Sequence, residues 1–446
     1  MLQLYYAPMY GVRSMCFVLK RIALLITFLI LSTTAASAET SESTLSLSTA
    51  LQRTLEQNPS LKVFQFRKEA LVGSSFTANL KPAYEIGIEA ENFAGSGETQ
   101  AFDSAELTVS LSSVLELGDK RSARSGLVSS SRDVLDTQLQ LESLELLAET
   151  TRRFIQIVAM QARAELAAEA VQLAGDTVST VGGRATAGAT PQAELRRAQA
   201  ALAMAKLVHG SIQQRLQLSK VLLSELWGIS APEFSRVEGD LFRFGEDVAF
   251  ETLYAGVSNN PAIRLFAAQE RVNAAELRLA KTQSSSDISW SIGIRQIREV
   301  DDTALVAGLS VPLFSGWRNK GEVSRVIAQR NAISMERDAS LHQLHTLLFN
   351  AYSSRQQAKL AVTQLNEAVI PALEEAVNQT RLGYQRGRFG YLEYITAAQE
   401  LLESKRMLIE SAAAVLLYGA EIEQMVADSV SIEQFMPASE KSGAEK

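Results

Sequence analysis

The stretch "LSVPLFSGWRNKGEV" (Leu309–Val323) joins a strand pattern to a helix pattern. Apolar residues alternate along it as far as Pro312, and from Trp317 onward the pattern becomes helical. Pro312 suits the end of a strand, where the ladder no longer needs its N–H, and Gly316 gives the backbone the freedom to bend. We therefore predict a strand that turns sharply into a helix.

A similar transition lies about 200 residues earlier, in "LSSVLELGDKRSARS" (Leu111–Ser125), with Gly118 at the bend. Val114 replaces the proline there, so we expect the two bends to differ. Because landmarks recur in one order at nearly one offset, and the period is far too long for a solenoid, we infer two copies of one large unit. The recurring landmarks are Asn58-Pro59 with Asn260-Pro261, Leu111 with Leu309, Gly188 with Gly387, and Glu194 with Glu393.

Each copy is predicted to contain the same parts. A short helix, capped by Ser48 in the first copy and by Asp247 in the second, ends at the Asn-Pro pair, because proline cannot continue a helix but suits the first turn of the next. A second helix, two strands, a very long helix, a glycine-rich turn and a last helix follow. The predicted organisation is a signal peptide at 1–38, a first repeat at 39–227, a linker at 228–246, a second repeat at 247–428 and a disordered tail at 429–446.

Four segments alternate between apolar and polar residues, which indicates strands at about 83–94, 104–114, 287–299 and 303–314. One interpretation is a soluble antiparallel sheet with a polar outer face. The alternative is a transmembrane barrel with its apolar positions toward lipid and a polar lumen. Four strands cannot close a conducting barrel, and open edges are not tolerated in lipid. The barrel interpretation therefore predicts an oligomer whose copies share one barrel.

The helices are predicted to be very long. Proline is absent from Lys120 to Thr180, whereas an ordinary globular helix has about 11–12 residues. The second copy runs from about Arg318 to Leu382, and Pro371 should kink it. The helix from Pro191 to Trp227, together with the helix before the strands, nearly matches the long one in length, which predicts one continuous helix paired with two shorter ones. Such helices form a coiled coil or a tube.

The N-terminus and the composition narrow the class of protein. A basic pair precedes a short apolar run (Ile22–Leu31) and an Ala-Ser-Ala site (Ala36–Ala38), which predicts a removed signal peptide. Cys16, the one cysteine, would leave with it, so no disulfide or thiol chemistry is expected. Removing three of the 43 basic residues leaves 40 against 50 acidic ones, a net charge of −10. This balance argues against a nucleic-acid partner.

No catalytic or metal site is predicted. The sequence lacks a glycine-rich phosphate loop, a metal-ligand cluster and a nucleophile motif. His342 and His345 are spaced so that they could share a helix face, but a solvated face is the favoured interpretation because no third ligand completes a site. We expect no cofactor and no enzyme activity.

The order and duplication of these features resemble the outer-membrane efflux proteins, the TolC-like family. The resemblance is carried by "NPSL" and "NNPAI", "VPLFSGW" and "GYQRGRFGYLEYITAAQ" (Gly383–Gln399), and it covers nearly all of the mature chain. It implies a mainly α fold with a small β part. In this family three identical chains share a twelve-stranded barrel, four strands from each, and continue it as a long periplasmic α-helical tube. Trp317 would then anchor at the membrane interface.

The resemblance also implies a function and partners. Members of the family are passive exit ducts in the outer membrane of Gram-negative bacteria and dock with a periplasmic adaptor and an inner-membrane pump. "LELGDKRSAR" resembles the "LELGGKR" pattern of the heavy-metal branch, with Asp119 in place of the second glycine, which implies divalent heavy-metal cations as cargo. The alternatives are a drug-efflux or type I secretion duct of the same fold, and a periplasmic coiled-coil scaffold, which would not explain the four strands.

The two helix turns are the candidate functional site, as a tip that closes the tube and docks with the adaptor. They are "GGRATAGATPQAEL" (Gly182–Leu195) and "GYQRGRFGYLEY" (Gly383–Tyr394), and in each a glycine precedes a glutamate by six residues. Glycine permits left-handed backbone at a tight turn. The alternative is an ordinary helical hairpin with an acidic first turn that suits the helix dipole. The predicted tip residues are Gly188, Glu194, Tyr384, Gly387, Arg388, Phe389 and Glu393.

In the family's best-known pattern a tyrosine, an arginine and two aspartates near this turn bond across chains and hold the tube shut. Tyr384 matches the tyrosine, and Glu393 stands where the first aspartate would be. Phe389 falls at the arginine and Thr396 at the second aspartate, so the polar lock is half present. We expect three copies of Glu393, with Glu194, to form an acidic ring that favours cations, and closure to depend more on the packing of Phe389.

Overall fold

The computed structural model describes residues 44–100 and 102–427. The predicted signal peptide and the predicted tail lie outside these residues. The described chain falls into two units. Thr44 and Glu233–Arg236 belong to the smaller unit, and residues 45–232 with 237–427 form the larger one. Within the described residues, no helix is both long enough and apolar enough to cross a membrane.

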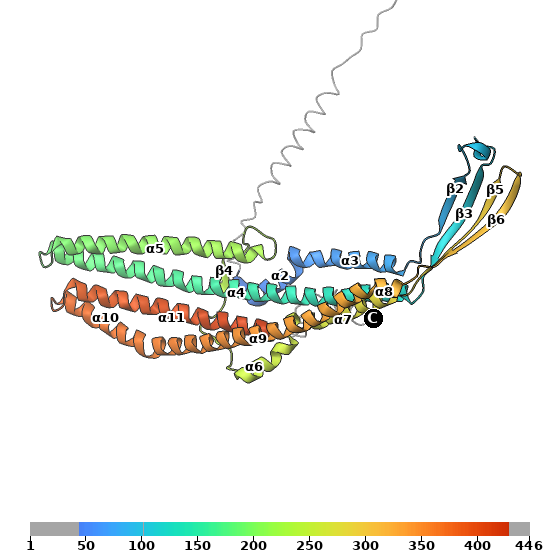
Figure 1. The fold of residues 1–446 in the computed structure, drawn as a ribbon. Helices are drawn as coiled ribbons and strands as arrows, with labels where there is room; N and C mark the ends of the chain where they lie inside the picture. The colour runs from blue at the N-terminus through green and yellow to red at the C-terminus, as the bar shows by residue number, and fades with distance from the viewer. Residues whose placement is uncertain (1–43, 101, 428–446) are drawn as a thin grey trace, which may run out of the picture. The chain divides into compact units, whose positions relative to one another are not determined.

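The two repeats fold into matching series of elements (Figure 1). The first contains β1 (Thr44–Ser46), α2 (Leu47–Gln57), α3 (Pro59–Asn79), β2 (Glu85–Glu91), η1 (Gly97–Thr99), β3 (Glu106–Leu115), α4 (Lys120–Thr186) and α5 (Gln192–Glu225). The short strand β4 (Arg236–Glu238) follows and pairs with β1. The second contains α6 (Phe250–Gly256), η2 (Val257–Asn259), α7 (Pro261–Gln283), β5 (Ile288–Ile297), β6 (Asp302–Ser310), α8 (Ser315–Arg318), α9 (Lys320–Gln364), η3 (Leu365–Val369), α10 (Ile370–Gln385) and α11 (Tyr391–Val426).

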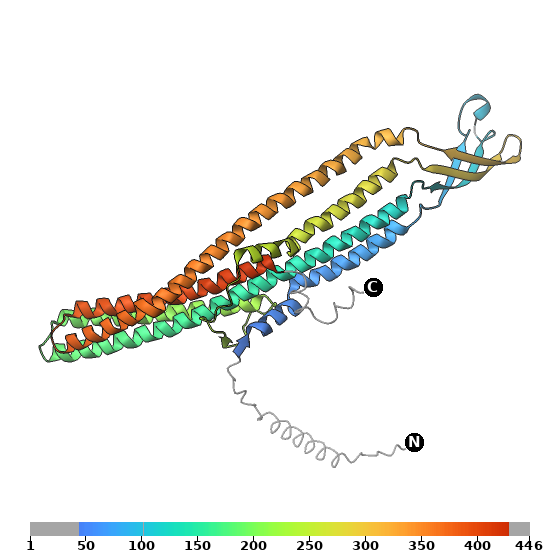
Figure 2. The same cartoon turned by 90° about the horizontal axis from the view of Figure 1, so that it is seen from below.

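In the first repeat a single helix runs the length of the helical part, and in the second α9, η3 and α10 follow one another along it. The 67-residue α4 packs against α5 over one half, and against α3 and α2 over the other (Figures 1 and 2). In the second repeat α9 packs against α11 and α7, and α10 continues along α11. Proline lacks an N–H and crowds the preceding turn, and the chain absorbs Pro371 with the five-residue π-helix η3 just before it. A long helix paired with two shorter ones is the arrangement predicted from their lengths.

The Asn-Pro pairs join consecutive helices and hold the last helix of the same repeat. The side chain of Asn58 accepts from the N–H of Ser60 at 2.7 Å, and its amide donates to the carbonyl of Leu226, just beyond α5, at 2.7 Å. Asn260 likewise caps α7 and donates to the carbonyl of Gln424 in α11 at 2.9 Å. Both asparagines are buried, so each bond satisfies a carbonyl that a helix end leaves without a partner.

Two predicted helix caps are wrong by a few residues. Ser46, not Ser48, caps α2, because the helix begins at Leu47 and Ser46 Oγ accepts from the N–H of Thr49. In the second repeat α6 begins at Phe250, after Ala249, so Asp247 caps no helix. Its carboxylate instead pairs with Arg355 and Lys359 of α9.

The four long strands form one antiparallel sheet in the order β2-β3-β5-β6, so the two hairpins meet at β3 and β5. The register brings most apolar residues of the four strands to one face, and the other face is mainly polar, with Val114, Ile297 and Val306 as apolar exceptions. The apolar rows are Ile86, Leu111, Ile292 and Ala307, then Ile88, Val109, Ile294 and Leu305. Leu305 is 81% exposed, whereas Thr108 on the polar face is only 5% exposed. The polar side of this sheet is therefore the more enclosed one.

The strand-to-helix bends depend on different residues from those predicted. At the second bend Phe314 has the positive φ of 62°, while Gly316 lies inside α8 without one, so the prediction that Gly316 makes the bend is wrong. At the first bend Gly118 and Asp119 both have positive φ, of 78° and 60°. A side chain on Gly118 would also meet Ser285 at 2.6 Å. The two bends are thus unequal, as the missing proline predicted.

Candidate functional site at the hairpin turns

The turns between α4 and α5 and between α10 and α11 have the same backbone geometry. Gly188 and Gly387 have φ values of 71° and 74°. In the first turn the N–H of Ala189 donates to the carbonyl of Arg184 at 2.8 Å, and in the second the N–H of Arg388 donates to that of Gly383 at 2.8 Å. These are the bonds by which a left-handed glycine ends a helix, so the duplication extends to the details of the two turns.

Arg184 joins the two turns. Its guanidinium donates to the carbonyls of Tyr384 and Gln385, at 2.8 Å and 3.1 Å, and lies 4.8 Å above the ring of Tyr384. The carbonyls at a helix C-terminus lack intrahelical partners and carry partial negative charge. The Arg184 guanidinium supplies both the hydrogen-bond donors and the opposite charge. The sequence interpretation missed Arg184, although a basic residue in the last turn of the long helix was a usable signal.

A buried tyrosine cluster lies beneath these bonds. Tyr384, Tyr391 and Tyr394 pack with Val181 of α4 and Ala198 of α5. The ring of Tyr384 stacks on that of Tyr394 at 6.2 Å and meets the edge of Tyr391 at 6.3 Å. The cluster draws on both repeats, so the ends of both hairpins in one chain are packed as a single body.

The two predicted acidic residues have different surroundings. Glu194 is half-buried and accepts hydrogen bonds from the hydroxyls of Tyr384, at 3.4 Å, and Thr190. Glu393 is exposed, close to the Cα of Gly390. Burial raises the pKa of Tyr384, with a smaller contribution in the same direction from the charge of Glu194, so its hydroxyl remains a donor to that carboxylate at neutral pH. Glu194 is therefore hydrogen-bonded within its own chain, while the Glu393 side chain lies exposed at the surface.

Phe389, Arg388 and Thr396 lie at the surface of the second turn. Phe389 is 47% exposed, and one side of its ring covers Gly383, where a Cβ would lie only 2.1 Å from a ring carbon. Phe389 is thus held on one side by its own chain and exposed on the other. The structure brings Glu194 and Tyr384 into direct contact and leaves Glu393, Arg388 and Phe389 on the outside.

The polar face of the sheet carries a charged network. Arg295 of β5 pairs with Glu91 of β2 at 3.1 Å and with Glu106 of β3 at 2.9 Å, and it donates to Thr108 at 3.0 Å. Asp287, just before β5, holds the first bend through Lys120 at 2.7 Å. The strand alternation gave no signal for either set of partners, since both depend on how the two repeats pair.

The histidine pair does not form a metal site within the described residues, which contain no cluster of three or more metal-binding side chains. His345 instead meets the rings of Tyr254 and Phe250 edge-on, at 4.8 Å and 5.5 Å between centroids. His342 is exposed one turn earlier.

Comparisons with known proteins agree on the fold. No family model matches the chain. It is 24% identical over 361 residues to the cobalt-zinc-cadmium resistance protein CzcC of Cupriavidus metallidurans, which covers 81% of this chain and 85% of that protein.

Among solved structures, the outer-membrane channel OprN superposes with a TM-score of 0.71 at 16% identity, over 85% of this chain and 89% of that one. The outer membrane protein VceC of Vibrio cholerae superposes with a TM-score of 0.66 at 18% identity, over 85% and 95%. The predicted resemblance and the predicted fold class, mainly α with a small β part, are thereby confirmed. The chain has the fold of the TolC-like outer-membrane efflux channels.

Proposed function

We propose that this chain is the outer-membrane component of a tripartite efflux system, a passive exit duct that three copies form together. The single observation that carries the proposal is the sheet. Most apolar residues of all four strands share one exposed face, which suits lipid, while the opposite face is mainly polar and less exposed, which suits a lumen. The proteins of known structure that share this fold include outer-membrane channels, which supports a location in the outer membrane with the helical part in the periplasm.

The sheet also explains why several copies are needed. In the described chain β2 and β6 are its two edges, and an unpaired strand edge is costly in lipid because no water satisfies its backbone groups. Closure needs β6 of one copy to pair with β2 of the next. Three copies give the twelve strands of the family, so the homotrimer is the assembly we propose.

The helical part offers matching contact surfaces. Met204, Val208, Leu218 and Leu222 of α5 are exposed at heptad positions, with Ser211 and Arg215 at the two positions between them. Such an apolar stripe suits contact with another helix. Phe66 and Phe76 of α3 are 66% and 69% exposed. Apolar side chains of this size on helices near the sheet and on helices far from it support a tube whose wall continues from copy to copy.

At the periplasmic end, the two turns would close the duct and dock with an adaptor and an inner-membrane pump. Because Glu194 is bonded to Tyr384, the acidic ring we propose consists of three copies of Glu393, with Phe389 filling the space inside or between them. Similarity to CzcC, whose name states cobalt, zinc and cadmium resistance, favours divalent metal cations as cargo. No enzyme activity is part of this proposal.

The test has two stages. Full-length chain is expressed in a Gram-negative host, the membranes are separated, and the outer-membrane fraction is crosslinked and run with and without heating. A heat-modifiable trimer that conducts ions in planar bilayers supports the duct, whereas a soluble periplasmic species rules it out and favours a coiled-coil scaffold. Deleting the gene in its own host should then lower tolerance to cobalt, zinc or cadmium salts. Unchanged metal tolerance with raised drug sensitivity would move the cargo to the alternative, a drug-efflux duct.

A further inference from the structure

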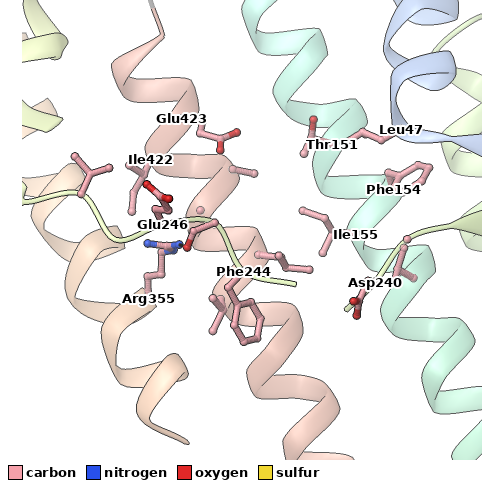
Figure 3. A pocket seen from close by; sticks show the side chains of 18 of the residues that line it. Leu47, Thr151, Phe154, Ile155, Asp240, Phe244, Glu246, Arg355, Ile422 and Glu423 are labelled. Carbon is pink, nitrogen blue, oxygen red and sulfur yellow. Dashed lines mark hydrogen bonds between the residues drawn. The ribbon is translucent and has the colours of Figure 1, made fainter. Parts of the chain in front are cut away.

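A cavity lies at mid-length of the helical part, between the two repeats, and the proposed duct gives it no role. It measures about 510 Å³ and is bounded by α4, α11 and the segment 238–248 (Figure 3). A second cavity of about 490 Å³ continues from it along α2 and shares Leu47, Thr151, Leu253 and Ile422 in its lining. Sites for small molecules in proteins have about 300–1,000 Å³, so the first cavity alone is large enough for one.

The inner wall of this cavity is apolar. Phe154, Ile155 and Val158 of α4 face Val415 and Ile422 of α11 across it. All five side chains are buried, and Phe244 of the linker also lines the cavity (Figure 3). A wall of this kind favours an apolar body of similar width, because burial removes apolar surface of both partners from water.

The rim of the cavity is acidic. Glu238, Asp240 and Glu246 of the linker and Glu423 of α11 line it, and all four are exposed. Burial of part of the Glu423 side chain raises the pKa of its carboxyl, and the charge of Arg355 opposes that shift. A cation bound at the rim would likewise favour the charged carboxylate.

Arg355 is the one cationic residue in the lining, and its charge is already engaged. It pairs with Asp247 at 3.0 Å and donates to the carbonyl of Gly245 at 3.2 Å. Lys359, which does not line the cavity, pairs with the same aspartate. Arg355, Lys359 and Asp247 together carry a net charge of +1, so with the four rim carboxylates an excess of three negative charges remains. An anionic ligand would therefore be repelled here and a cationic one attracted.

We propose that this cavity binds an amphiphilic organic cation, with the apolar body against α4 and α11 and the positive charge at the rim of Glu238, Asp240, Glu246 and Glu423. The occupant is fixed by two independent features, the apolar wall and the sign of the charge around it. This inference does not depend on the efflux function, because it concerns equilibrium binding to the purified chain.

The test uses two probes of the same shape and opposite charge, tetraphenylphosphonium and tetraphenylborate. Full-length protein in lipid nanodiscs is titrated with each by equilibrium dialysis, with empty nanodiscs subtracted, and hydrogen exchange locates the protected amides. We expect saturable binding of the phosphonium alone, at one site per chain, with protection at 238–248 and 415–423.

Three variants separate the features. Glu246→Gln with Glu423→Gln should weaken phosphonium binding about tenfold, since two attractive charges are lost and the shape is kept. Ala420→Leu should abolish it, because Ala420 lines both cavities and a larger side chain there takes up the space against α11. Glu251→Gln removes an acidic residue of α6 outside the lining and should have no effect.

Equal binding of the borate, binding unchanged by the first two variants, or no saturable binding would each overturn the proposal. Hydrogen exchange over the rest of each variant reports whether it has folded. If Ala420→Leu does not fold, the glutamine pair, which changes almost no volume, decides the result.

Discussion

The guanidinium of Arg184 lies 4.8 Å above the ring of Tyr384 and donates to the carbonyl of the same residue at 2.8 Å. These two residues belong to different repeats, 200 positions apart, and they meet at the turns that end the two hairpins. Through them the tip of one chain behaves as a single body. Opening of an assembled tube should then occur between chains rather than within one.

Arg184→Ala should loosen both turns. It removes a cation–π contact and two charge-assisted hydrogen bonds to a helix end, which together contribute about 1–3 kcal/mol. Hydrogen exchange should accelerate at 183–189 and 383–390 and stay unchanged in the sheet. Arg184→Lys keeps the charge but not the planar fork, so it should give an intermediate result, and Arg388→Ala at the surface serves as the control. Equal protection in Arg184→Ala and wild type would show that the tyrosine packing alone holds the turns.

The tyrosine cluster should make the tip sensitive to alkaline pH. Burial raises the pKa of both Tyr384 and Tyr391 in the folded protein. The unfolded chain therefore loses these protons first, so the stability they contribute is present below about pH 10 and is lost as the pH rises through their folded values.

Phenolate absorbance should show this directly. The absorbance titration of the double variant Tyr384→Phe, Tyr391→Phe is subtracted from that of the wild type, which leaves the ionisation of these two tyrosines. That ionisation should occur above the ordinary pH range for tyrosine. A difference step at or below pH 10 would contradict the burial of these rings in the assembled protein.

The buried asparagines at the Asn-Pro pairs should each stabilise the fold in two ways. The side-chain oxygen caps the following helix, and the side-chain NH2 donates to a carbonyl at the end of the last helix of the repeat. Asn58→Ala loses a helix cap and leaves the carbonyl of Leu226 without its partner, a cost of about 1–3 kcal/mol. Asn58→Asp keeps the cap acceptor but places a carboxylate against that carbonyl, so it should lower the thermal unfolding midpoint at least as much as alanine does. Asn260→Asp should behave in the same way. If aspartate restored wild-type stability at either position, the cap would be the whole contribution.

The two faces of the sheet should respond oppositely to charge. Ile88 and Glu89 are neighbours in β2 and both are exposed, but Ile88 shares the apolar face. Ile88→Lys should cost about 2–4 kcal/mol if that residue lies in the middle of a bilayer, and the heat-modifiable trimer should decrease in the outer-membrane fraction. Glu89→Lys, on the lumen side, should assemble normally. Equal yields of the two variants would argue against lipid on the apolar face.

The proposed acidic ring predicts a change in ion selectivity. Glu393→Gln should lower the cation preference of single channels, because three like charges are removed from one level of the lumen. Glu194→Gln should leave selectivity unchanged and instead destabilise the tip, since Glu194 is bonded to Tyr384 and Thr190. Unaltered selectivity in Glu393→Gln would remove the ring from the mechanism.

Local patterns in the chain predicted much of this fold. Alternation marked the four strands because a half-exposed strand must separate apolar from polar residues every second position. The absence of proline marked α4 because proline is the residue that most strongly interrupts a helix. Gly188 and Gly387 were identified as turn residues by their spacing, and both have the left-handed conformation that ends a helix. The resemblance to efflux channels rested on the order of such local features.

The sequence pattern predicted helix caps and bends less reliably, because several neighbouring residues are able to take the same structural position. Ser46, Ser48 and Thr49 are all able to cap a helix, and only the position of its first turn selects Ser46. At the second bend the left-handed residue is Phe314 although Gly316 is close by, because the path from β6 into α8 fixes where the chain must turn.

By itself, the sequence determined the two repeats, through landmarks that recur about 200 residues apart. It also determined the kinds of element in each repeat and the apolar or polar character of their faces, since these depend on neighbours within a few positions. Only the tertiary structure decided which residues of the two repeats contact each other. Arg184 with Tyr384, Arg295 with Glu91 and Glu106, and the acidic cavity beside Glu423 each join segments far apart along the chain. Such contacts depend on how whole helices and strands pack. The local periodicity of the sequence does not predict which distant segments will meet.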